Sequence, residues 1–363
     1  MIPLEEDKSI VERFFVREGC ARDEHGSVVP GVEYDARVGL ILKIAPLIRK
    51  IIASDEDLFS VERDVRHGDT LRATSVGRNF IRYIGKDYFE VADDQDYRLN
   101  PYFEVFYSCV NRYGLRKTIS RIDNVWGDLV EEAVEILNSC VEDIRREIKS
   151  SSFKARLKSY RRSVVENYRE LNSYVDDLFN LHARMLVLRV DLSYLEYFRG
   201  VDGVTVTDVC QHRSRLLKDL KANVFGPLLG YAWKFEKGKR KGLHYHLLLF
   251  FDGGKVRQDV TLARMIGEHW RAVVTEGRGT YYNCNAFKEG YEFCGIGMVD
   301  HTDQRAREGL RRIVLYMTKL DEYFKLSVPG VRCFGKGIRP KAFEVRRGRP
   351  RRSDLLLPSV NGY

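Results

Sequence analysis

Apolar positions in the middle of the chain follow the spacing of two amphipathic helices. Over residues 122–148 they recur every three or four residues, "KSSS" interrupts the pattern, and a second run covers residues 153–178. This spacing places the apolar side chains on one face of each helix. We therefore expect a long helical hairpin over residues 121–182, after a mixed, mostly helical region over residues 1–120.

Beyond residue 182 the pattern changes to short apolar runs that alternate with helical segments. Strands are expected at 184–194, 228–236, 243–251, 280–286 and 295–301, and helices at 205–224, 259–277 and 307–326. The order β-α-β-β-α-β-β-α predicts an α+β domain over residues 183–330. Its sheet should be small, should contain antiparallel strands and should carry helices on one face. Residues 331–363 are expected to form a basic tail.

The strand "LHYHLLLFF" carries two histidines within an apolar run. Side chains alternate along a strand, so His244 and His246 point to the same face. Glu236 lies nearly opposite His244 if the intervening loop closes a symmetric hairpin. Two imidazoles and one carboxylate form a metal site with open positions for water and a phosphate oxygen. Asp191 is the alternative carboxylate, and the competing interpretation is one hydrogen-bonded core histidine beside an exposed one.

A second candidate element lies in the predicted helix 307–326. Tyr316 and Lys319 are three residues apart and therefore neighbours on one helical face, and Tyr323 returns to nearly the same face. A phenol has a pKa of about 10 and is a poor nucleophile unless a cation stabilises its anion. A nearby lysine or a bound metal ion would do this. Ordinary packing of the three side chains is the alternative.

Positive charge is concentrated near the C-terminal end of the chain. The 363 residues carry a net charge of +9, and residues 332–352 hold nine basic residues against one acid, Glu344. Such a block favours a polyanion, most commonly nucleic acid, although a solvated tail has the same composition. We expect nucleic-acid contacts from the hairpin loop and the tail, at Lys237, Lys239, Arg240, Lys241, Arg346, Arg347, Arg349, Arg351 and Arg352.

Composition bears on three further classes of protein: membrane proteins, secreted proteins and zinc-binding proteins. No apolar run approaches the roughly 18 residues of a membrane helix, and the polar, acidic start argues against a signal peptide. Seven cysteines without paired spacing suit reduced thiols, which favours a cytoplasmic location. Cys284, Cys294 and His301 are a weaker candidate for a structural zinc site, because their spacing matches no common zinc finger.

Together these motifs resemble those of the HUH endonucleases. The nearer resemblance is to the inovirus-type replication proteins of filamentous phages, satellites and cryptic prophages, the YagK/YfjJ-like family. It covers roughly residues 184–339 and rests on "GLHYHLLLFFDGGKV", "GRGTYYNCN", "CGIGMVDH", "YMTK" and "CFGKGI". Some relatives use two tyrosines, which makes Tyr323 a candidate second nucleophile.

The resemblance implies a mechanism. In such enzymes a magnesium or manganese ion polarises the scissile phosphate of single-stranded DNA, and its ligands would be His244, His246 and Glu236 here. Tyr316 would attack the phosphorus and stay linked to the 5′ end, while Lys319 steadies the charge. The freed 3′ hydroxyl would start rolling-circle replication, so the expected partners are single-stranded origin DNA and the host helicase and polymerase. The alternative is a non-catalytic DNA-binding regulator of a phage or prophage.

Overall fold

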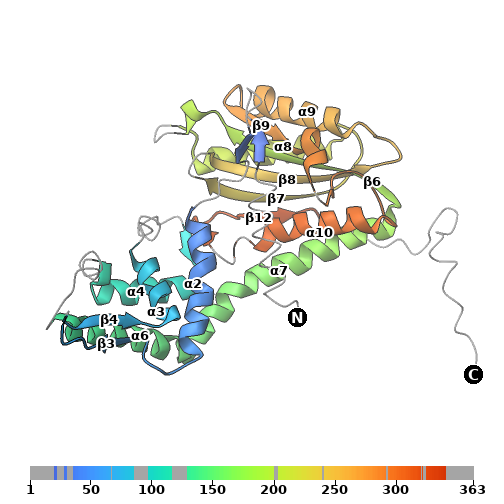
Figure 1. Cartoon of the computed structure of the whole chain (residues 1–363). Coiled ribbons are helices and arrows are strands. Elements are labelled where there is room, and N and C mark those ends of the chain that lie inside the picture. Colours follow the sequence, from blue (N-terminus) through green and yellow to red (C-terminus); the bar gives the residue numbers. More distant parts are fainter. Residues whose placement is uncertain are drawn as a thin grey trace, which may run out of the picture.

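The chain folds into an antiparallel sheet domain joined to a mostly helical N-terminal part (Figure 1). This α+β class is the one that the sequence predicts. The computed structural model describes residues 20–22, 28–30, 36–66, 68–85, 97–116, 129–199, 203–238, 241–291, 293–319, 321 and 324–340. None of the helices in these ranges is long and apolar enough to cross a membrane.

The N-terminal part has a hydrophobic core of its own. Four helices pack with one hairpin in it: α2 (Ala36–Ile52), α3 (Ser75–Ile84), α4 (Pro101–Arg112), α6 (Leu129–Lys149), β3 (Phe59–Glu62) and β4 (Thr70–Ala73). A further pair of strands, β1 (Cys20–Arg22) and β2 (Val28–Pro30), precedes them. Buried Arg145 of α6 donates to the Ile51 carbonyl at the end of α2 and to two carbonyls of the next loop. This side chain therefore joins α6 to α2.

Helix α7 (Ser151–Leu181) connects the two parts of the molecule (Figure 1). It begins after Ser150, whose side chain accepts a hydrogen bond from the Phe153 N–H, so the "KSSS" segment does break the helical pattern. The two successive helices pack against different partners. Helix α6 packs in the N-terminal core, whereas the second half of α7 packs on the sheet.

The C-terminal domain is built on one antiparallel sheet with the strand order β10-β6-β8-β7-β12, in which β9 also pairs with β6. Its strands are β6 (Arg184–Tyr194), β7 (Leu228–Gly238), β8 (Gly242–Asp252), β9 (Gly279–Asn283), β10 (Gly297–Asp300) and β12 (Phe334–Lys336). The helices among them are α8 (Val206–Lys221), α9 (Asp259–His269) and α10 (Gln304–Lys319). The order of elements from β6 to α10 is therefore the predicted one.

Helices cover both faces of the sheet, which corrects the expectation of one covered face (Figure 1). Helices α7 and α10 pack on Val187 and Leu248, while α8 and α9 pack on Leu188 and Leu247. The second half of "LHYHLLLFF" is apolar at every position, so both faces of β8 need cover there. That run is the signal in the sequence for a two-sided arrangement.

Two of the predicted helices, those at 259–277 and 307–326, end well before the expected residue. Helix α10 spans Gln304–Lys319, and Phe324–Leu326 forms a strand, β11, that pairs with β5 (Tyr97–Leu99). Helix α9 ends at His269 and continues as a short π-helix, Trp270–Val274. The helix predicted at 307–326 is thus wrong in its last part, because apolar spacing alone does not reveal a strand whose partner lies far away in the sequence.

Candidate metal and nucleophile site

One face of the sheet carries polar and charged side chains on three adjacent strands. Each strand supplies two of them, two positions apart and therefore on the same face: Arg189 and Asp191 on β6, His244 and His246 on β8, Lys234 and Glu236 on β7. In the strand register Asp191 stands opposite His246, and His246 stands opposite Lys234. Glu236 stands opposite His244, so the β7–β8 hairpin is symmetric as predicted.

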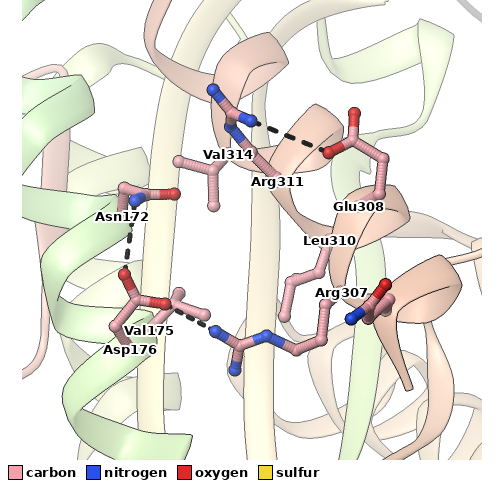
Figure 2. Close-up of a pocket in the computed structure, with 9 residues that line it drawn as sticks. Asn172, Val175, Asp176, Arg307, Glu308, Leu310, Arg311 and Val314 are labelled. Carbon is pink, nitrogen blue, oxygen red and sulfur yellow. Dashed lines mark hydrogen bonds and ion pairs between the residues drawn. The ribbon is translucent and has the colours of Figure 1, made fainter. Parts of the chain in front are cut away.

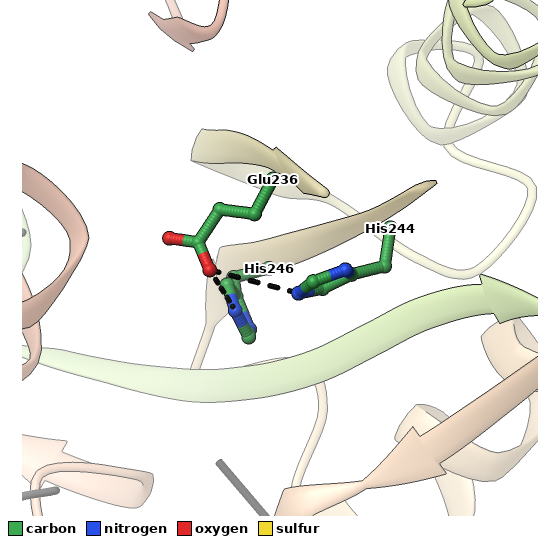
Figure 3. Close-up of side chains that lie close together, drawn as sticks. All are labelled: Glu236, His244 and His246. Carbon is green, nitrogen blue, oxygen red and sulfur yellow. Dashed lines mark hydrogen bonds and ion pairs between the residues drawn. The ribbon is translucent and has the colours of Figure 1, made fainter. Parts of the chain in front are cut away.

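Glu236, His244 and His246 converge and form what we call the Glu-His-His cluster (Figure 3). The Nε2 atoms of His246 and His244 lie 3.2 Å and 3.6 Å from Glu236 Oε2. Ligands held at about 2.1 Å by one ion stand about 3.0–3.4 Å apart. The His246 distance falls in this range and the His244 distance is slightly longer, so a small movement of His244 would let the three side chains share one metal ion. Glu236 Oε1 is buried without a hydrogen-bond partner among the described residues, and it is therefore a further donor atom for an ion.

The other nitrogen of each imidazole is held by a separate acceptor. His246 Nδ1 lies 2.7 Å from Asp191 Oδ1, and His244 Nδ1 lies 2.9 Å from the Gly242 carbonyl oxygen. A hydrogen bond donated from Nδ1 fixes the orientation of an imidazole ring and leaves the lone pair of Nε2 available to a metal ion. In both histidines this Nε2 atom faces Glu236. Asp191, the alternative ligand, thus supports His246 from behind.

Burial and mutual charge set the protonation of this group. Burial alone would raise the pKa of Asp191, but His246 and Arg189 hold it well below its usual range. Burial would also raise the pKa of Glu236, but His246 and His244 hold it well below its usual value. Burial disfavours charged His246, yet the two carboxylates raise its pKa above the ordinary value. Both carboxylates are therefore ionised at neutral pH, which is the form in which a carboxylate binds a cation.

Tyr316 reaches the Glu-His-His cluster from α10. Its hydroxyl lies 3.3 Å from His246 Nε2, and the Arg189 guanidinium lies 4.9 Å from the centre of its ring. The side chain is only 4% exposed, so Tyr316 also packs in the core, as the packing interpretation requires. Burial and the Glu236 carboxylate raise the pKa of Tyr316 well above its ordinary value, while Arg189 opposes them. The phenol is therefore protonated at neutral pH.

The other predicted site residues have different positions. Lys319 is on α10, three residues beyond Tyr316, and its side chain is outside the described part of the molecule. Lys241 Nζ lies 3.9 Å from Asp191 Oδ2, beside the cluster, whereas Lys237 projects from the opposite face of β7. Predicted residues that lie outside the described ranges are Lys239, Arg240, Tyr323, Arg346, Arg347, Arg349, Arg351 and Arg352.

The zinc site considered from the sequence does not form. Cys284 is buried in the core, the Cys294 thiol donates to the Ile296 carbonyl, and His301 Nδ1 lies 3.1 Å from the Ala183 carbonyl oxygen. Within the described ranges, the group of side chains close enough to hold one ion is the Glu-His-His cluster. The zinc interpretation is therefore wrong.

Two buried cations belong to the site and were not anticipated. Arg189 Nε lies 3.5 Å from Asp191 Oδ1, under the Tyr316 ring. Lys234 forms a buried ion pair with Asp321, just beyond α10. Each cation precedes a predicted site residue by two positions, Arg189 before Asp191 and Lys234 before Glu236. That spacing within a strand was the available signal, since it places the side chains on one face.

A separate pocket of about 360 Å³ lies between α7 and α10 (Figure 2). Arg307 pairs across it with Asp176, and Arg311 pairs with Glu308 on its wall. Val314, two residues before Tyr316, also lines it. The Arg307–Asp176 pair joins α10 to α7, so this wall supports the helix that carries Tyr316.

Manganese uptake tests the cluster. We expect the wild-type chain to bind Mn²⁺, and His246→Ala to weaken binding by more than about 100-fold because a ligand is lost. Asp191→Ala removes the support for His246 but none of the three proposed ligands, and the loss of such a supporting group typically costs about 10- to 100-fold in affinity. His269→Ala is the control, since His269 pairs with Asp219 on the other side of the sheet. Equal affinities of wild type and His246→Ala in isothermal titration would contradict the assignment.

Comparison with known proteins identifies one family. Its model, the YagK/YfjJ C-terminal domain, matches residues 148–337. This range contains all of α7, the sheet, α10 and the Glu-His-His cluster. No match was found among curated proteins or among solved structures. The match begins at residue 148, whereas the resemblance seen in the sequence begins near residue 184. The family domain therefore includes α7, which is consistent with the packing of α7 on the sheet.

Proposed function

The chain belongs to the YagK/YfjJ C-terminal domain family, and from that premise we propose that it nicks and joins single-stranded DNA. Membership suggests a phage- or prophage-associated protein. In the proposal, the reaction depends on a divalent metal, proceeds through a covalent 5′-phosphotyrosine and initiates rolling-circle replication of the phage or mobile element, as in HUH endonucleases. The observation that carries the proposal is the position of the Tyr316 hydroxyl, 3.3 Å from His246 Nε2 in the Glu-His-His cluster.

In the proposed reaction Tyr316 is the nucleophile. Its oxygen bonds to the phosphorus of the scissile phosphate, and the bond between that phosphorus and the 3′ oxygen of the preceding nucleotide breaks. The 3′ oxygen leaves with the electron pair and takes up a proton, while the phenol releases one. The tyrosyl ester keeps the phosphodiester bond energy, so attack by a 3′ hydroxyl rejoins the strand. The side chain stands on a rigid helix, which keeps the oxygen oriented.

Neighbouring side chains support this attack. Glu236, His244 and His246 would hold the ion, and a bound magnesium or manganese ion would polarise the scissile phosphate. Arg189 lies close to the Tyr316 ring and opposes the rise in the pKa of its phenol that burial and Glu236 cause, which favours the anion that must attack. Lys241 brings a positive charge to the edge of the cluster, where a phosphate would enter.

A second candidate function is a DNA-binding regulator without catalysis. Two observations favour it: the nine basic residues within 332–352, and the burial of Tyr316 among core residues. In that case the tail would supply affinity for phosphates and Tyr316 would only pack. The two functions differ in one product, the covalent link between protein and DNA.

The experiment that separates them uses labelled single-stranded DNA covering the element that encodes the chain. The protein is incubated with this DNA in Mn²⁺ or in EDTA, and the products are run on a denaturing gel. The proposal predicts a labelled protein–DNA adduct with Mn²⁺ and none with EDTA. Retarded DNA on a native gel without an adduct on the denaturing gel would favour the regulator.

A further inference from the structure

Two aromatic side chains stack at the edge of the sheet, beside the site. Tyr282 is the fourth residue of β9, and Phe287 lies in the 3₁₀ segment Cys284–Gly290 that follows. Their ring centres are 5.5 Å apart and their planes differ by 6°, which is an offset parallel stack. Phe287 is 45% exposed, although large aromatic side chains are usually well covered.

The register of the sheet places this stack next to the Glu-His-His cluster. Tyr282 stands directly opposite Asp191, so both side chains project from the same face of the sheet. Asp191 in turn contacts His246. Tyr282 is partly buried and packs against the hydrophobic core that contains Tyr316. The stack is therefore linked to the Glu-His-His cluster through Tyr282 and Asp191.

The segment that carries Phe287 is held firmly to the sheet. Buried Asn285 accepts a hydrogen bond from the Arg189 N–H and donates to the Val187 carbonyl, both on β6. The Asn283 side chain accepts from the backbone N–H groups of the next turn. A rigid aromatic surface loses little conformational entropy when a flat partner stacks on it, so this geometry favours binding.

We propose that a nucleobase of the single-stranded DNA stacks on the exposed face of Phe287. The inference rests on the proposed function and identifies where that substrate is held. Single-strand binding sites combine a cation for the backbone with aromatic side chains for the bases. Lys241 and Tyr282 both approach Asp191, the lysine from the β7–β8 hairpin and the tyrosine from β9. Lys241 would meet the phosphate, and Phe287 would meet the base of a nearby nucleotide.

The test measures affinity without cleavage. Labelled oligothymidylate and an abasic strand of equal length are titrated in EDTA with Tyr316→Phe protein, which lacks the nucleophilic oxygen. Phe287→Ala should weaken oligothymidylate binding by roughly 5- to 150-fold, the range for loss of one stacked base. It should leave abasic-strand binding unchanged. Phe287→Trp should retain tight binding because it keeps a flat ring.

Controls decide between stacking and general damage. Met265→Ala removes a side chain that is 49% exposed on α9, on the other side of the sheet, and should have no effect. Equal affinity of Phe287→Ala and the parent for oligothymidylate overturns the inference, and so does an equal loss on both strands. Base-dependent loss without any nicking by wild type would support the stacking surface and refute the nuclease. If wild-type and Phe287→Ala proteins nicked DNA equally well, the nuclease would be supported and the stacking surface refuted.

Discussion

Tyr316→Phe should eliminate the covalent protein–DNA adduct while the fold is retained. The substitution removes the attacking oxygen and keeps the ring that packs beside His246 and Arg189. Loss of a nucleophile lowers kcat on the order of 10⁶-fold in a well-studied protease, so no adduct should be visible. Loss of the hydroxyl contact with His246 should cost only about 1 kcal/mol of stability. The measurement is a denaturing gel of labelled single-stranded DNA after incubation with Mn²⁺.

Two further tyrosines give the matched comparisons. Tyr282→Phe changes a tyrosine on the same face of the sheet without touching the proposed nucleophile, so its adduct should remain. Tyr323→Phe should also leave the adduct if Tyr316 acts alone. If the two tyrosines alternate, each single variant still forms one adduct and strand transfer stops. An undiminished adduct in Tyr316→Phe would refute the assignment and make Tyr323 the next candidate.

Lys234→Met should destabilise the sheet domain by about 3–5 kcal/mol. Lys234 and Asp321 form an ion pair in which both side chains are almost completely buried. Removing the lysine leaves a buried carboxylate without its counter-charge, which is far more costly than losing an exposed pair. Asp321 follows α10, so adduct formation should fall as well. The free energy of unfolding is measured by urea denaturation of the full chain.

A double variant separates this cause from a general packing defect. In Lys234→Met/Asp321→Leu no charge remains buried, so most of the lost stability should return. Lys255→Met is the control, because the Lys255 side chain is 69% exposed. If Lys234→Met lowered the stability by no more than Lys255→Met does, the ion pair would not hold the end of α10 on the sheet.

The Glu-His-His cluster was predictable from local rules. A period of two along β8 places His244 and His246 on one face, and a short hairpin brings Glu236 opposite His244. The elements from β6 to α10 were equally visible, because their apolar spacing changes sharply from one element to the next. Both inferences concern neighbours in sequence or in one hairpin, where spacing determines geometry.

Longer-range contacts were not predictable in this way. Asp191 supports His246 from a strand 55 residues earlier, and spacing cannot decide which β6 residue faces which β8 residue. The placement of Tyr316 over the cluster came from a family resemblance, since periodicity does not show where α10 docks. Arg189 and Lys234 do not stand out in the sequence because a charged residue in a strand is usually solvent-exposed, whereas α7 and α10 cover this face.

Mass spectrometry of the adduct tests the central claim most directly. Wild-type protein is incubated with single-stranded DNA and Mn²⁺, the adduct is digested with nuclease and protease, and the modified peptide is fragmented. We predict that the peptide containing Tyr316 carries a nucleotide linked through its 5′ phosphate, and that fragmentation assigns the phosphodiester to the Tyr316 oxygen. An unmodified Tyr316 in a sample whose DNA is attached to another residue, or in one that forms no adduct, would contradict the assignment.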